Sequence, residues 1–220
     1  MSEALPILYS FRRCPYAMRG RMALMVSGAK VELREIILRD KPAAMIEASP
    51  KATVPVLDMR HMNGEVVDES LALMNWALHQ NDPEGWLGGD PVLTEALIAE
   101  NDGPFKHHLD RYKYATRYEG ADETVHRTEG RKFLERLNTQ LADKKNLLGD
   151  ERSKVDIAIF PFVRQFRIAD MDWFDALELN TLKAWLARHM ESDLFKGVMK
   201  KYALWTPDEE GVVFGEGIYL

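Results

Sequence analysis

The sequence predicts a small α/β domain with the element order β-α-β-α-β-β-α, followed by an all-α helical bundle. Short strand-like and helix-like segments alternate over residues 5 to about 80, and beyond them only long helical stretches are evident. The intervening segment 81–91, NDPEGWLGGDP, is rich in glycine, proline and aspartate, as linkers are. The expected boundaries are therefore 1–80 for the first domain, 81–91 for the linker and 92–220 for the helical domain.

The elements of the first domain follow from local patterns of apolar and turn residues. In chain order we expect a strand over 5–9, a helix from Pro15 to Gly28, a strand beginning at 31, a short helix after Pro42, strands over 54–57 and 66–67, and a helix opening at 68–70 and running through 78. Asn63-Gly64 between the last two strands is a hairpin signal. The final helix is apolar around most of its circumference, which predicts burial.

The helical domain is expected to hold four long helices and a short one. These cover about 92–118, 122–145, 154–169 and 179–190, with the short helix near 194–200. Ser153 and Asp156 form a capping box with Asp in place of Glu, which predicts the start of the third helix. We expect a structural role for this box.

Composition and charge limit the classes of function. Hydrophobic residues make up 46% and charged residues 29% of the 220 residues, which is ordinary for a globular protein. A formal net charge of −6 argues against broad nucleic-acid binding. The sequence holds no apolar run of the roughly 18 residues that a membrane helix needs, and its first residues lack the pattern of a secretory signal. A single cysteine fits a reducing compartment, so we expect a cytoplasmic protein without nucleic-acid or membrane partners.

Cys14 is the candidate nucleophile. It follows a predicted strand and opens a predicted helix, with Pro15 at the first helical position, where no N–H is needed. The free N–H groups and the positive end of the helix dipole favour the thiolate there. A buried cysteine that only fills space is the alternative, but the strand–cysteine–helix setting favours the reactive thiol.

Four arginines, Arg12, Arg13, Arg19 and Arg21, are close to Cys14 in sequence. They predict either a cationic patch for a small anionic ligand or a solvated helix face. Charge alone leaves both interpretations open.

Three motifs carry a resemblance to a known family. Residues 14–17, Cys-Pro-Tyr-Ala, resemble the glutaredoxin motif with Ala17 in place of the second cysteine, and are similar to the cysteine motif of omega-class glutathione transferases. Thr53-Val54-Pro55 resembles the family's loop with a cis proline, and Glu69-Ser70 resembles the pair that holds the γ-glutamyl end of glutathione. The chain therefore resembles the cytosolic glutathione transferase superfamily, in its cysteine-type, omega-like class. This resemblance implies that the first domain is thioredoxin-like.

The resemblance also implies which residues contact glutathione, the expected cosubstrate. Besides catalytic Cys14 they are Tyr16, Lys41, Val54, Pro55, Glu69 and Ser70. A helix N-terminus with a serine hydroxyl suits a carboxylate, and an acidic side chain suits an ammonium group. Plain capping of the helix by Asp68 or Ser70 is the alternative.

In the helical domain, Tyr112, Arg117, Phe166 and Trp173 are candidates for a second-substrate pocket, although such aromatic residues can also be packing residues. His107-His108 invites a metal interpretation. We expect no metal, because adjacent residues do not share a helix face and no cysteine or carboxylate pattern accompanies them.

The expected function is a glutathione-dependent thiol transferase that forms a Cys14–glutathione mixed disulfide. Ala17 excludes an internal disulfide cycle. Two alternatives stay open: transfer, isomerisation or dehalogenation on a carbon electrophile, with Cys14, Ser10 or Tyr9 stabilising the glutathione thiolate, and non-catalytic binding of glutathione or another ligand. The second substrate is expected to be a small electrophile or disulfide, and the resemblance implies a homodimer.

Overall fold

The structure is a computed structural model that describes residues 4–215. It divides into two compact units. One combines the residues up to Pro83 with those from Ser192 onward, and the other runs from Glu84 to Glu191. Two segments lie outside the described residues. They are residues 1–3, part of the N-terminal segment that lacks the pattern of a secretory signal, and residues 216–220 of the C-terminal tail.

The first unit is built on one mixed sheet. Its strands are β1 Ile7–Ser10, β2 Val31–Glu35, β3 Val56–Asp58, β4 Val66–Val67 and β5 Val212–Phe214. They lie in the order β4-β3-β1-β2-β5, in which β1 and β2 are parallel and every other neighbouring pair is antiparallel. The 3-10 helix η1 Arg60–Met62 and the left-handed Asn63, with φ 60°, lie between β3 and β4 and complete the expected hairpin.

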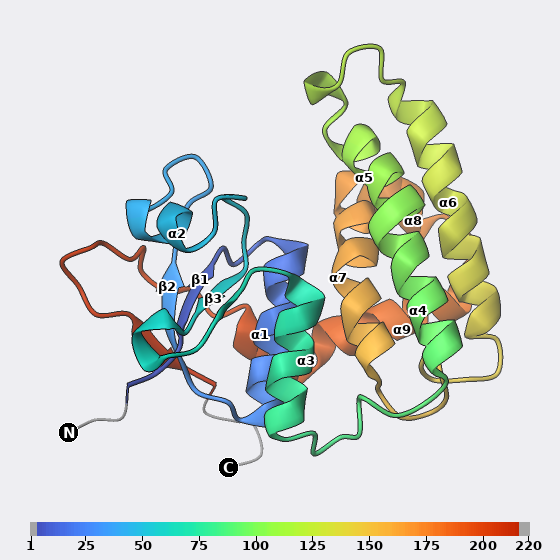
Figure 1. Ribbon diagram of the computed structural model, residues 1–220. Coiled ribbons are helices and arrows are strands. Elements are labelled where there is room, and N and C mark those ends of the chain that lie inside the picture. Colours follow the sequence, from blue (N-terminus) through green and yellow to red (C-terminus); the bar gives the residue numbers. More distant parts are fainter. Residues whose placement is uncertain (1–3, 216–220) are drawn as a thin grey trace. The chain divides into compact units, whose positions relative to one another are not determined.

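The helices of this unit are α1 Pro15–Ser27, α2 Ala43–Ala48, α3 Ser70–Gln80 and α10 Asp193–Val198. Helices α1 and α3 lie side by side (Figure 1). A Cβ atom at Gly20 would come within 2.5 Å of a terminal methyl group of Leu73, so a larger residue here would displace that side chain. Gly28, at φ 73°, ends α1 in the left-handed conformation that the sequence predicts. The order β1-α1-β2-α2-β3-β4-α3 confirms the predicted one.

The C-terminal segment of the first unit differs from the expected all-helical domain. Strand β5 pairs with β2 at the edge of the sheet, with Val31 opposite Phe214. Residues between α10 and β5 also bind β2, since the backbone N–H of Trp205 donates to the carbonyl of Glu35 at 2.8 Å. Residues 192–215 therefore belong to the α/β unit. The local sequence does not predict this, because a strand of three residues carries too little pattern to indicate its distant partner β2.

The second unit is helical. Its α-helices are α4 Pro91–Glu100, α5 Lys106–Lys113, α6 Glu123–Gln140, α7 Lys154–Ala169, α8 Met171–Asp175 and α9 Asn180–Glu191, with the π-helical turn η2 Asn101–Phe105 joining α4 to α5 and the 3-10 helix η3 Ala115–Arg117 after α5 (Figure 1). Helices α4 and α6 begin at Asp90 and Asp122, whose carboxylates accept two backbone N–H bonds each. None of the helices among the described residues has the length and apolarity needed to cross a membrane.

Asp156 organises the core of this unit. The capping box with Ser153 is present at the start of α7, as predicted. The buried carboxylate also accepts the backbone N–H of Leu147 and the indole N–H of Trp185, both at 2.9 Å. It thus ties the loop before α7 and helix α9 to the start of α7.

Candidate functional site

Cys14 lies at the N-terminus of α1, in the N-cap position directly before Pro15. Its backbone N–H donates to the carbonyl of Phe11 at 3.0 Å, which closes a turn between β1 and the helix. The side chain is partly buried, and its Sγ lies 3.7 Å from the carbonyl oxygen of Val54. The local signals therefore place the thiol beside the positive end of a helix, as the sequence predicts.

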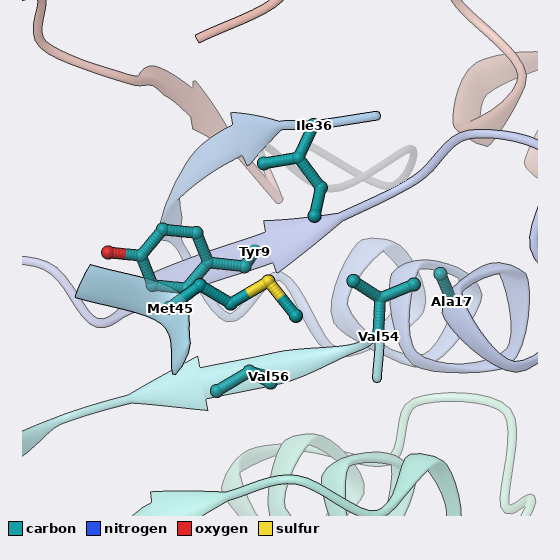
Figure 2. Close-up of a cluster of buried hydrophobic side chains, with 6 residues drawn as sticks. All are labelled: Tyr9, Ala17, Ile36, Met45, Val54 and Val56. Carbon is teal, nitrogen blue, oxygen red and sulfur yellow. The ribbon is translucent and has the colours of Figure 1, made fainter. Parts of the chain in front are cut away.

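The Val54–Pro55 peptide bond is cis, in agreement with the loop that the sequence resembles. Val54 is 6% exposed and belongs to a cluster of buried side chains with Ala17 and Tyr9. Figure 2 shows the side chain of Val54 beside Ala17 of α1. Cys14 packs against this cluster, which consists of Tyr9, Ala17, Ile36, Met45, Val54 and Val56. A rigid apolar floor therefore fixes the cysteine and the cis-proline loop relative to one another.

The loop before Cys14 is held by a buried ion pair. Arg21 Nη1 lies 3.5 Å from Glu35 Oε2, and both side chains are almost fully buried. Glu35 Oε1 accepts the backbone N–H of Arg12 at 2.6 Å, and Arg21 Nη2 donates to the carbonyl of Arg12 at 2.5 Å. The ion pair therefore binds both the backbone N–H and the carbonyl of Arg12, which lies two residues before Cys14.

Burial dominates the electrostatics of this ion pair. It lowers the pKa of Arg21 to about 10, against the opposing effects of Glu35 and Cys14, so the guanidinium stays charged at neutral pH. Burial also raises the pKa of Glu35, and the N–H of Arg12 and the charge of Arg21 partly offset this rise. Arg21 is thus positively charged at neutral pH and interacts electrostatically with Cys14.

The expected patch of four arginines is only partly present. Arg13 is exposed and Arg12 half-buried, whereas Arg19 and Arg21 are 0% exposed. The solvated-face interpretation is therefore wrong for the last two, and a patch open to a ligand does not include them. Sequence reasoning missed their burial because the partner of Arg21, Glu35, comes from β2.

The start of α3 presents the polar groups expected for the γ-glutamyl end of glutathione. Glu69 is the N-cap residue with an exposed side chain, and Ser70 is the first, buried residue of the helix. Ser70 Oγ lies 3.4 Å from Arg19 Nη1. Lys51 Nζ lies 2.6 Å from Glu69 and 3.0 Å from Asp68, so a lysine that sequence reasoning missed pairs with this acidic edge.

The remaining predicted contacts of the first unit are distributed around this site. Tyr16 is half-buried and lies under the guanidinium of Arg19 at 5.3 Å. Lys41 is half-buried in the loop before α2, and none of its contacts with residues 4–215 supports a role in binding. Two hydroxyls of β1 were alternatives to Cys14: Tyr9 accepts from Arg34 at 3.0 Å, and Ser10 is 0% exposed.

In the second unit, three of the four candidate pocket residues lie together. The Tyr112 ring centroid lies 4.8 Å from that of Phe166 and 6.5 Å from that of Trp173. Tyr112 and Phe166 are buried, as packing residues are, and burial raises the pKa of Tyr112. Arg117 is exposed and stacks on the Tyr114 ring at 4.3 Å, so the structure does not group it with the other three.

Comparisons with known proteins agree with this arrangement. A family model described as glutathione S-transferase, N-terminal domain, matches residues 8–85, and one described as glutathione S-transferase, C-terminal domain, matches residues 65–188. Glutathione S-transferase omega-1 from Sus scrofa is 27% identical over 200 residues, covering 86% of this chain and 78% of that protein. A glutathione S-transferase of Methylobacillus flagellatus KT, solved with glutathione bound, has a TM-score of 0.75 at 19% identity and covers 88% of this chain and 98% of that one. Glutathione transferase Omega 3C of Trametes versicolor has a TM-score of 0.73 at 20% identity, over 88% and 84% of the two chains.

Proposed function

Because the chain belongs to the glutathione S-transferase family, we propose that it is a glutathione-dependent thiol transferase that works through a mixed disulfide between Cys14 and glutathione. Membership of the family confirms the expected superfamily and its omega-like relatives, the two-part fold and glutathione as cosubstrate. The finer proposal concerns the chemistry at Cys14. Its main support is the position of this thiol, at a helix N-terminus and 3.7 Å from the backbone of the cis-proline loop.

The residues present fit glutathione. A glutathionyl sulfur bonded to Cys14 would lie near the backbone of Val54, where a peptide can form main-chain hydrogen bonds. The exposed carboxylate of Glu69 suits the ammonium group of the γ-glutamyl residue, and the N-terminus of α3 at Ser70 suits its carboxylate. Lys51 pairs with Glu69 in the structure, so the ammonium group of glutathione would take the place of the Lys51 ammonium group at the Glu69 carboxylate.

The proposed reaction is an exchange of thiolate for disulfide in two steps. In the first, the Cys14 thiolate attacks the glutathionyl sulfur of a mixed disulfide, the bond between the two sulfurs breaks, and the substrate leaves as a thiolate that takes up a proton. In the second, a glutathione thiolate attacks the Cys14-bound sulfur, which releases oxidised glutathione and restores the Cys14 thiolate. Each turnover consumes one free glutathione, the other glutathionyl group of the oxidised product comes from the substrate, and no second protein cysteine is needed.

The chain supports both steps with fixed charge. The end of α1 and the charge of Arg21 stabilise Cys14 as an attacking thiolate and, in the second step, as a leaving group. Ala17 occupies the place where a resolving cysteine would compete with the second glutathione, and it is 0% exposed.

The test is turnover of a small glutathione mixed disulfide by the wild type and by Cys14→Ser, with intact-mass analysis for a glutathione adduct. We expect turnover and an adduct in the wild type and neither in the variant. Tyr9→Phe is the matched control, because its hydroxyl is engaged by Arg34, and it should keep its activity. No turnover in the wild type would refute the proposal, and a product with a stable carbon–sulfur bond would assign the chain to conjugation instead.

Two further expectations remain part of the proposal. We infer a small electrophile or disulfide as second substrate, which would contact the half-buried Trp173, while the buried Tyr112 and Phe166 support that ring. We also infer a homodimer from family membership. Light scattering on the purified chain tests the second inference, and a mass equal to one chain of 25.2 kDa would refute it.

A further inference from the structure

Three histidines lie close together in the second unit. His107 and His108 lie on α5, and His126 lies on α6. Each offers one ring nitrogen, and these three atoms lie within 4.8 Å of one another. The sequence argument against a metal considered only the adjacent pair, and it missed the third histidine because α6 brings it there from beyond the loop after α5.

The geometry of the cluster is close to that of a ligand set. His108 Nδ1 and His126 Nδ1 lie 2.9 Å apart, which allows one ring to donate a hydrogen bond to the other. Two nitrogen ligands of a tetrahedral zinc ion are about 3.3 Å apart, for zinc–nitrogen bonds of about 2.0 Å. Small rotations of the side chains would bring all three nitrogens to that separation. The ring centroids are 5.0–5.7 Å apart, so no other side chain separates the rings.

We propose that His107, His108 and His126 form a binding site for a divalent transition-metal ion of the zinc type. Imidazole nitrogen is the ligand that zinc, nickel and copper share, and the site contains no thiolate. On binding, the proton shared by the two Nδ1 atoms moves to an Nε2 atom and leaves both lone pairs free for the metal.

The charges around the cluster are mixed. Glu129 lies one helical turn from His126 on α6 and interacts electrostatically with His108, but both of its carboxylate oxygens accept from Lys132 at 2.6–2.7 Å. Asp122 favours positive charge at His126. Arg111 opposes it, and its Nη1 lies 3.0 Å from His107 Nδ1, so His107 would bind through Nε2 or displace this contact.

Occupation of the site would fasten α5 to α6. Tyr112 lies one turn from His108 on α5, so a bound ion would also fix the helix that carries part of the proposed substrate cluster.

The experiment is calorimetric titration of the tag-free, full-length Cys14→Ser protein with Zn²⁺, and separately with Mg²⁺. The Cys14→Ser background removes the one thiolate that would compete for zinc. We expect one equivalent of Zn²⁺ and no saturable binding of Mg²⁺. His126→Ala and, separately, His107→Ala, whose native side chain is exposed, should each weaken Zn²⁺ binding at least about tenfold. His79→Ala is the control and should not weaken it, because His79 lies on α3 and is hydrogen-bonded to a carbonyl of that helix.

Folding of each variant is checked by circular dichroism, and the thermal midpoint is measured with and without Zn²⁺. We expect the ion to raise the midpoint of the parent and not that of His126→Ala. Absorption of the Co²⁺-loaded parent should show bands typical of nitrogen ligands. No saturable Zn²⁺ binding, unchanged affinity in both histidine variants, or equal binding of Mg²⁺ would overturn the proposal.

Discussion

The ion pair between Arg21 and Glu35 offers a direct test of how the loop before Cys14 is held. Both charges are buried, and their nearest atoms are 3.5 Å apart. At this distance and an effective dielectric constant of about 20, opposite unit charges attract by about 5 kcal/mol. Removing one partner leaves the other charge buried without compensation, at a cost of about 3–5 kcal/mol. We therefore expect Glu35→Gln and Arg21→Met each to lower the free energy of unfolding by that amount.

The double variant separates the interaction energy between Arg21 and Glu35 from the other effects of each substitution. Because the partner is already absent, Arg21→Met combined with Glu35→Gln should cost at least about 2 kcal/mol less than the sum of the single variants. The assay is urea unfolding of all four proteins, followed by far-ultraviolet circular dichroism. Single costs below about 1 kcal/mol, or costs that add within about 0.5 kcal/mol, would refute the assigned role of the pair.

The same variants should affect catalysis through Arg12. Glu35 accepts the backbone N–H of Arg12 and Arg21 donates to its carbonyl, and Arg12 lies two residues before Cys14. We expect turnover of a glutathione mixed disulfide to fall in Glu35→Gln while the variant is still folded. Arg13→Gln is the control, since Arg13 is exposed and no such bond involves it. Equal losses in the two variants would contradict the positioning role of Glu35.

Three further predictions follow from single contacts. Asp156→Ala should lower the free energy of unfolding by about 4 kcal/mol in urea unfolding, because buried donors of Ser153, Leu147 and Trp185 lose their acceptor. Burial lowers the pKa of His189 from 6.5 to about 3. Between these two pH values the unfolded chain binds a proton at His189 that the folded chain does not bind, so lowering the pH favours unfolding. Lowering the pH from 7 to 5 should therefore cost about 2 kcal/mol, and His189→Gln should lose less when both are unfolded in urea at the two pH values. Glu69→Gln should raise the KM for glutathione about tenfold with little change in kcat, whereas Lys51→Met should lower that KM, because the carboxylate is then free for the ligand. Identical KM values in the wild type and both variants would count against this position for the ammonium group.

The elements that the sequence predicts correctly are those with signals inside a short window. Pro15 and Gly28 mark the two ends of α1, and Ser153 with Asp156 marks the start of α7. The N-terminal position of Cys14 also agrees with a short motif, whereas the isomer of the bond before Pro55, which is cis in the structure, does not follow from the sequence alone. A helix end or a turn is determined by neighbouring residues, so one chain without relatives is enough to predict it.

The features that the sequence does not predict depend on residues far apart in the chain. Arg21 resembles a surface arginine in sequence because its partner Glu35 is distant in the chain, and the sequence does not show that His126 on α6 lies beside His107 and His108. Strand β5 pairs with β2, from which most of the sequence separates it, and its two valines are exposed as they would be in a loop. Periodicity reports burial along one segment, and it does not show which distant segment provides the partner.

The pairing of β5 with β2 has a consequence for the order in which the protein is made. Residues 212–214 leave the ribosome after the whole second unit, so a nascent chain carries the first four strands with one edge of β2 unpaired. An unpaired edge can add a strand from another molecule. Translation therefore exposes a risk of aggregation that lasts until the C-terminal segment emerges, and a ribosome that stalls within the second unit would prolong it.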